Sequence, residues 1–102
     1  MSRSDHTVRL LRIAEDDLTE IISYISVDRP SAAEKLAARI EKNLHLLART
    51  PHLGRVPKEE ELLRSGYRFL AVEDYLVFYT IEGTTILVHR ILHGARDYLN
   101  LI

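Results

Sequence analysis

Two amphipathic stretches joined by only a few residues constrain the fold more than any other feature of the sequence. Apolar side chains recur at helical spacing in the second stretch, at Ala33, Leu36, Ala37, Ile40, Leu44 and Leu47. They recur in the same way in the first stretch, at Leu18, Ile21, Ile22 and Ile25. Arg29-Pro30 interrupts the pattern between them. Because so short a link leaves two helices side by side, the sequence predicts an antiparallel helical hairpin.

The ends of these two helices can also be predicted. Glu15-Asp16-Asp17 suit a first turn, where the helix macrodipole favours negative charge, so we expect the first helix over about residues 15–27. Ser31 and Glu34 match a capping box at the start of the second helix. Thr50-Pro51 is expected to end that helix.

Beyond residue 66 the sequence changes to strand-forming residues. Glu73-Asp74 and Glu82-Gly83 fall where tight turns between strands are needed. The runs that flank these turns are rich in Tyr, Phe, Val, Ile and Leu, and they cover residues 67–72, 75–81 and 85–93. Their short connections predict an antiparallel meander.

Two further segments complete the expected order of elements. Residues 7–14 alternate as a first strand, and residues 95–102 are expected to add one short helical turn. The order is then β-α-α-β-β-β, and two packed layers bury the apolar side of both helices and sheet. We therefore predict an α+β fold with a helical hairpin on a four-stranded antiparallel sheet. One domain is expected across residues 1–102.

Composition and charge exclude several classes of function. The chain has no cysteine, which excludes thiolate zinc sites and thiol nucleophiles. Its glycines are scattered and no predicted helix carries two histidines four residues apart, so we expect no cofactor and no metal. A formal net charge of -1 provides no basic lobe for nonspecific nucleic-acid binding. No apolar run approaches the length of a membrane span, so we expect a soluble cytoplasmic protein.

Chemically useful side chains gather at the last predicted strand. Strict alternation along residues 85–93 puts His89 and His93 on one face and Arg90 on the other. Arg68 and Arg96 are expected at the same part of the sheet. Guanidinium groups bind phosphate or carboxylate, and histidine exchanges protons near neutral pH.

A purely structural role for the same residues is the alternative. Arg96 would then pair with Asp97 or with a carboxylate of a helix. His93 would form a hydrogen bond to a backbone carbonyl and shape the turn at Gly94.

Taken in order, these features resemble the RelE/ParE superfamily, the toxic half of type II toxin–antitoxin pairs. The matching segments are Ala14–Leu18 with Ile21, Ile22 and Tyr24, Pro30 with Ala33 and Leu36-Ala37, Leu47 with Pro51 and Gly54, Gly66-Tyr67-Arg68, Tyr75–Tyr79, and Val88–Asp97. They span most of the chain, and the RILHGARD ending is the sharpest fragment. The resemblance implies a helical hairpin on an antiparallel sheet, with the first strand beside the last.

The superfamily divides into two branches with different targets. The slightly acidic charge of this chain favours the ParE-like branch, whose members act on DNA gyrase, inhibit growth and stabilise plasmids. The resemblance then implies a gyrase inhibitor that a cognate antitoxin silences. The residues expected to contact the target are Arg90, His93, Arg96 and Tyr98.

Two alternatives remain open at this point. RelE-like members are ribosome-dependent messenger RNA endonucleases, for which Arg68, His93 and Arg96 would supply proton transfer and a cation for the developing charge. A homologue that binds an antitoxin without being toxic is the second alternative. In every case an antitoxin is the expected partner, and it would bind the helical hairpin or an edge strand.

Overall fold

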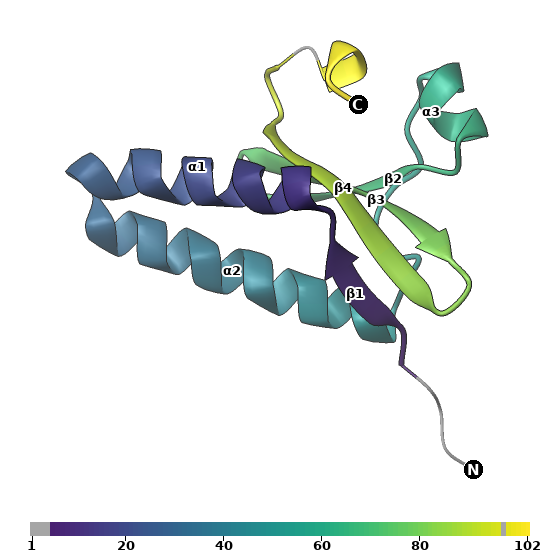
Figure 1. Ribbon diagram of the computed structural model, residues 1–102, viewed down its shortest axis with the longest axis horizontal. Helices are drawn as coiled ribbons and strands as arrows, with labels where there is room; N and C mark the ends of the chain where they lie inside the picture. Colours follow the sequence, from purple (N-terminus) through teal and green to yellow (C-terminus); the bar gives the residue numbers. More distant parts are fainter. Residues whose placement is uncertain (1–4, 97) are drawn as a thin grey trace.

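The computed structural model describes residues 5–96 and 98–102, which form a helical layer against a sheet. In chain order the elements are β1 (Thr7–Leu10), α1 (Arg12–Asp28), α2 (Pro30–Arg49), α3 (Glu60–Arg64), β2 (Arg68–Val72), β3 (Tyr75–Glu82), β4 (Thr85–His93) and the 3₁₀ turn η1 (Tyr98–Asn100). Helices α1 and α2 run side by side in opposite directions (Figure 1). The predicted α+β fold, a helical hairpin on a four-stranded sheet, is therefore confirmed.

The sheet is mixed, which corrects the prediction that it is antiparallel throughout. Its strand order is β1-β4-β3-β2, and β1 runs parallel to β4 while the other two pairs are antiparallel. The first strand does lie beside the last. Alternation in a strand determines which residues face the core, but it does not determine the direction in which an edge strand pairs. The helical hairpin separates β1 from the meander, so no short turn imposes an antiparallel pairing.

Both helices begin earlier than their sequence patterns suggest. The first strand stops at Leu10 instead of residue 14, and α1 starts at Arg12, because the fully buried Ala14 lets the first helical turn pack closely on the core. The capping box is also wrong, because Pro30 occupies a first-turn position of α2 and Arg29 becomes its N-cap without a side-chain hydrogen bond. A proline at this position has a backbone angle already suited to a helix.

The main hydrophobic core lies between the helical hairpin and the sheet. The stripe of α2 contributes its buried residues Ala33, Leu36, Ile40 and Leu47, as the sequence predicts. A second, smaller cluster lies on the other face of the sheet and contains Leu62, Phe78 and Leu92. Leu62 belongs to α3, and the C-terminal segment, residues 98–102, packs on this cluster through Tyr98, Leu101 and Ile102. In the part of the chain that the structure describes, no helix has the length and apolar character needed to cross a bilayer.

A bulge in β4 changes which side chains share a face of the sheet. Phe78 pairs with Arg90, whereas the next residue of β3, Tyr79, pairs with Val88. His89 is therefore an extra residue in β4. One inserted residue reverses the facing of everything beyond it, so simple alternation fails at this point.

A buried tyrosine attaches the loop after α2 to the sheet. The Tyr79 side chain is fully buried, and its hydroxyl donates to the Pro51 carbonyl at 2.8 Å and accepts from the Gly54 amide at 2.9 Å. This arrangement brings the Gly54 backbone very close to the sheet. A Cβ atom on Gly54 would lie 2.6 Å from the Phe69 carbonyl oxygen and 2.7 Å from the Tyr79 hydroxyl.

We predict that Gly54→Ala lowers the free energy of unfolding by about 1–3 kcal/mol, because a methyl group has no room there without moving backbone. Gly94→Ala is the matched control, since its Cβ would lie at an ordinary 3.4 Å from the Asp74 carbonyl oxygen. Chemical denaturation of both variants measures the difference. Equal stability of the Gly54→Ala variant and the native chain would contradict this account of the loop.

Candidate functional site

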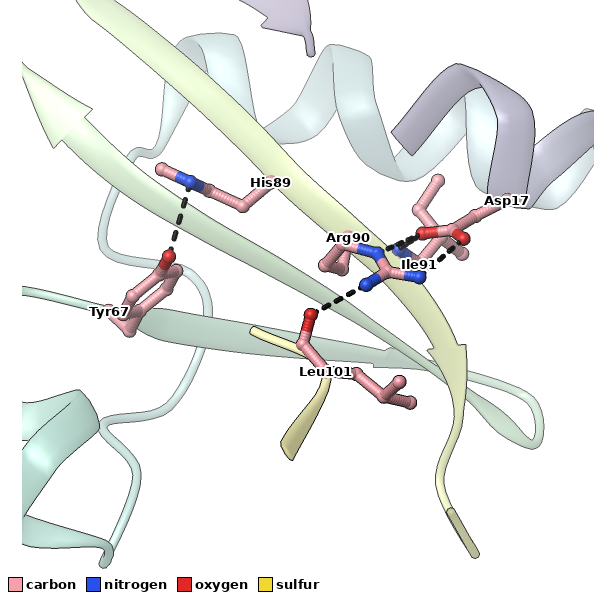
Figure 2. Close-up of polar contacts among 6 residues, drawn as sticks. All are labelled: Asp17, Tyr67, His89, Arg90, Ile91 and Leu101. Carbon is pink, nitrogen blue, oxygen red and sulfur yellow. Dashed lines mark hydrogen bonds and ion pairs between the residues drawn. The ribbon is translucent and has the colours of Figure 1, made fainter. Parts of the chain in front are cut away.

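Asp17 joins α1 to the exposed edge of β4. Its carboxylate accepts from Arg90 Nε at 2.8 Å, from Arg90 Nη2 at 2.9 Å and from the Ile91 backbone amide at 3.0 Å (Figure 2). The strand β1 ends at Leu10, which pairs with Val88, so beyond that point β4 has no neighbouring strand on its β1 side. Asp17 supplies the acceptor that a strand would otherwise provide for Ile91.

The same ion pair also holds the C-terminal segment. Arg90 Nη1 donates to the Leu101 carbonyl at 2.6 Å, so all three guanidinium nitrogens donate within the chain. The side chains of Asp17 and Arg90 are only 13% and 14% exposed. The hydrogen bond to Asp17 raises the pKa of Arg90 further above its ordinary value, against the opposing effect of burial. Arg90, predicted to contact the target, therefore connects α1, β4 and the C-terminal segment.

The bulge turns His89 to the face of the sheet away from α1 and α2. Its Nδ1 lies 3.2 Å from the Tyr67 hydroxyl (Figure 2), and its Nε2 lies 2.9 Å from the Thr80 hydroxyl. Burial lowers the pKa of His89, although Glu82 acts weakly in the opposite direction. The expectation that His89 and His93 share a face is wrong, because His93 lies after the bulge and contacts Tyr75, whose side chain packs on the helix-side core.

Tyr98 fastens the C-terminal segment to the outer face of the sheet. Its hydroxyl donates to Glu59 at 2.9 Å, and its ring lies 5.0 Å from that of Phe78. The hydrogen bond to Glu59 is the main reason that the pKa of Tyr98 is raised. Tyr98 was also predicted to contact the target, and in the structure its hydroxyl and ring both have partners within the chain.

Arg68 does not join the other two residues of the predicted nuclease group. It pairs with Tyr79 on β3, whereas His93 pairs with Tyr75, four positions away and thus about 13 Å along the strand. Its Nη2 donates to the Gly54 carbonyl at 3.0 Å and to the His52 carbonyl at 3.3 Å. The prediction that all three residues gather is therefore wrong for Arg68. The carbonyls of the Gly54 loop are nearer acceptors for it.

His93 and Arg96 do lie together, at the end of β4. They line a hollow of about 310 Å³ between α1 and β4, which we call the α1–β4 hollow. Its other lining residues are Asp17, Glu20, Ile21, Tyr24, Tyr75, Ile91 and Leu92. His93 Nδ1 accepts from the Ala95 amide at 3.1 Å, so the turn is shaped by a backbone N–H and not by a carbonyl. The suggested partner of Arg96, Asp97, lies outside the described residues.

The residues of α1 in this hollow were missed at the sequence level, although their spacing carried a signal. Asp17, Ile21 and Tyr24 succeed one another at helical spacing, which places a carboxylate and a tyrosine in line with the apolar stripe. Asp17 was interpreted only as part of a favourable first turn. Within residues 5–96 and 98–102, no group of three or more His, Asp or Glu side chains is arranged to hold a metal ion.

The arrangement of helices and strands defines the class of protein. It matches a structure of the chromosomal ParDE toxin–antitoxin system from P. aeruginosa, with a TM-score of 0.72 and 22% identity over 86% of this chain and 95% of that one. It also matches a chain of the toxin–antitoxin complex RelBE2 from Mycobacterium tuberculosis, with a TM-score of 0.61 and 25% identity over 87% of this chain and 98% of that one. The fold is that of the RelE/ParE superfamily.

Sequence comparison narrows this class to one family. Residues 8–98 match the family described as the ParE toxin of the type II toxin–antitoxin system parDE. The chain is also 33% identical to Toxin ParE1 of Caulobacter vibrioides over 91 residues, which cover 87% of this chain and 90% of that protein. The chain therefore belongs to the ParE toxin family of type II toxin–antitoxin systems.

We predict that Asp17→Ala lowers the free energy of unfolding by about 3–5 kcal/mol, because it leaves the Arg90 charge and the Ile91 amide without their acceptor. Asp16→Ala is the matched control, since Asp16 is 70% exposed and forms only a 3.7 Å surface pair with Arg12. That variant should differ from the native chain by less than about 1 kcal/mol. Equal losses for the two variants in urea unfolding would refute the role of Asp17.

The lowered pKa of His89 predicts that stability falls in mild acid. Unfolded chains take up this proton near the ordinary histidine pKa of about 6.5, whereas the folded chain takes it up only at lower pH. The contribution is therefore present above about pH 6.5 and is lost as the pH falls through that value toward the folded pKa.

His89→Gln should flatten this part of the pH dependence, because glutamine does not titrate. His45→Gln, at an exposed position on α2, serves as the control and should keep the native slope. Unfolding free energies measured between about pH 7.5 and pH 5.5 provide the comparison. An unchanged slope in the His89→Gln variant would show that another group is responsible.

Proposed function

We propose that this toxin inhibits DNA gyrase by binding to it, and that a cognate antitoxin silences the toxin. The proposal rests on the positions of the candidate cleavage residues Arg68, His93 and Arg96, which do not lie around one point. Arg68 donates to loop carbonyls, whereas His93 and Arg96 lie together at the end of β4. Cleavage of a phosphodiester needs a base, an acid and a cation around one point. The separation of Arg68 from His93 and Arg96 argues against such a centre.

Charge supports a protein target over a nucleic acid. The chain has a formal net charge of -1 and an isoelectric point near 6.5, so its overall field does not attract a phosphate backbone. A surface that recognises another protein needs no such field. It needs exposed anchor residues beside apolar surface, and the α1–β4 hollow provides both.

Of the four residues predicted to contact the target, His93 and Arg96 are the ones we propose for direct contact. Both are exposed at the end of β4. Arg90 and Tyr98 act indirectly, because both hold the C-terminal segment in place. Arg90 on β4 donates to the Leu101 carbonyl, and the Tyr98 hydroxyl donates to Glu59. The proposed contact surface is therefore the exit of β4.

A messenger RNA endonuclease is the second candidate, because His93 and Arg96 place a proton carrier beside a cation. Primer extension on translated messages after induction decides between the two. If the native chain produces cuts in translated messages, and these cuts disappear in the His93→Ala and Arg96→Ala variants, the endonuclease function replaces the gyrase proposal. A chain whose induction without antitoxin leaves growth unchanged would instead be a nontoxic antitoxin-binding homologue.

We predict that an excess of the purified toxin stops supercoiling of relaxed plasmid by purified gyrase. The Arg96→Glu variant should reach the same inhibition only at an excess at least about tenfold higher, since interface arginines are often dominant contacts. Arg64→Glu is the matched control, because Arg64 is an exposed arginine of α3 that forms only a surface pair with Glu60. Unchanged supercoiling at high excess of native toxin would overturn the proposal.

A further inference from the structure

We propose that the solvent face of α2 contacts the phosphate backbone of the DNA duplex that gyrase holds, while the exit of β4 contacts gyrase itself. This inference rests on the proposed function, because it adds a second component of the same target. The face consists of Lys35, Arg39, Lys42, Leu46 and Arg49, and we call it the α2 basic face.

Helical spacing places the cations of the α2 basic face in one row. Its members follow one another at intervals of three or four residues, from Lys35 to Arg49, and they lie opposite the stripe that α2 buries against the core. All of them are exposed. With a rise of about 1.5 Å per residue, the row is about 21 Å long. The acidic residues of α2, Glu34 and Glu41, lie off this row, so no carboxylate interrupts it.

The charges of this face are largely uncompensated. Among the described residues, the side chains of Lys35, Lys42 and Arg49 have no hydrogen-bond or ion-pair partner. Arg39 Nε lies 3.2 Å from Glu73, in an exposed pair of a kind that contributes little. Like charges three or four residues apart on a helix repel one another, and a solvated face usually mixes both signs. A row of one sign therefore indicates a counter-charge outside the chain.

The composition of this face favours a phosphate backbone over an acidic protein segment. Lysine is depleted at protein–protein interfaces, whereas lysine and arginine are the side chains that neutralise phosphates. Leu46, 42% exposed, is the only large apolar side chain of the row, so the apolar centre that a protein partner needs is small. Duplex DNA carries about one negative charge per 1.7 Å of its axis, and it presents that charge without interruption along the length of the row.

The α2 basic face is a supplementary contact and does not replace gyrase as the target. The formal net charge of -1 provides no long-range attraction for DNA. Local cations act at short range, within a Debye length of about 8 Å at physiological salt. A duplex that gyrase has already brought to the toxin meets this condition.

The two proposed surfaces lie on different parts of the molecule, so the toxin can use both at once. Helix α2 runs along the lower side of the view in Figure 1, whereas the end of β4 leads to the upper side. Helix α1 packs against both of them. Contact with gyrase through His93 and Arg96 therefore leaves the α2 basic face open toward DNA.

The first test measures binding of the purified full-length toxin to a short fluorescent DNA duplex, by anisotropy over a series of salt concentrations. Lys35→Glu/Lys42→Glu should weaken binding at least about tenfold and lower the slope of log Kd against log salt by about 2. Arg12→Glu/Arg64→Glu is the matched control, because it reverses two exposed charges of the same sign away from α2. Its affinity should stay within about threefold of native. Circular dichroism and thermal melting verify that all variants are folded.

The second test repeats the supercoiling assay with the same variants. Lys35→Glu/Lys42→Glu should reach native inhibition only at an excess about tenfold higher, because the contact with DNA is lost. Its affinity for gyrase without DNA should stay native, since the exit of β4 is unchanged. Arg12→Glu/Arg64→Glu should inhibit as the native toxin does.

The possible outcomes separate this inference from the gyrase proposal. Absence of duplex binding by native toxin, native duplex affinity in Lys35→Glu/Lys42→Glu, or an equal loss in the control would overturn the inference. If the α2 variant loses inhibition but keeps native duplex affinity, the face recognises gyrase as a protein and the inference also fails. Unchanged supercoiling with native toxin would refute the gyrase proposal alone, because duplex binding lost only in the α2 variant would still support the contact with DNA.

Discussion

The carboxylate of Asp17 is the interaction on which the other parts of this structure depend. It replaces the missing strand neighbour of β4 at Ile91, and it fixes the guanidinium group of Arg90. Through Arg90 it also reaches the Leu101 carbonyl of the C-terminal segment. One buried ion pair thus sets the positions of α1, the end of β4 and the C-terminal residues relative to one another. The α1–β4 hollow lies between two of these parts, α1 and the end of β4.

This constraint separates two groups of polar residues that look alike in the sequence. Arg68, Arg90 and Tyr98 hold backbone and carboxylate groups inside the chain. His93 and Arg96 remain at the surface beside apolar side chains and an exposed tyrosine. Such a division favours recognition of a protein surface over catalysis of phosphodiester cleavage, because catalysis needs these groups to converge on one point.

The sequence predicted the helical hairpin, the meander and the superfamily, since apolar periodicity and ordered motifs are local signals. It could not predict the direction of β1, because no short turn connects that strand to its neighbour β4. It also could not place His89, because the bulge arises from pairing between strands and has no mark in the residues themselves. Asp17 was predictable in part, from its position in line with Ile21 and Tyr24.

The most direct test of a toxin that acts by binding gyrase is the topology of a reporter plasmid in cells that express the toxin alone. We expect the plasmid to lose negative supercoils as growth stops, with translated messages still intact. Growth arrest with unchanged plasmid topology would contradict this account and would require a target other than gyrase.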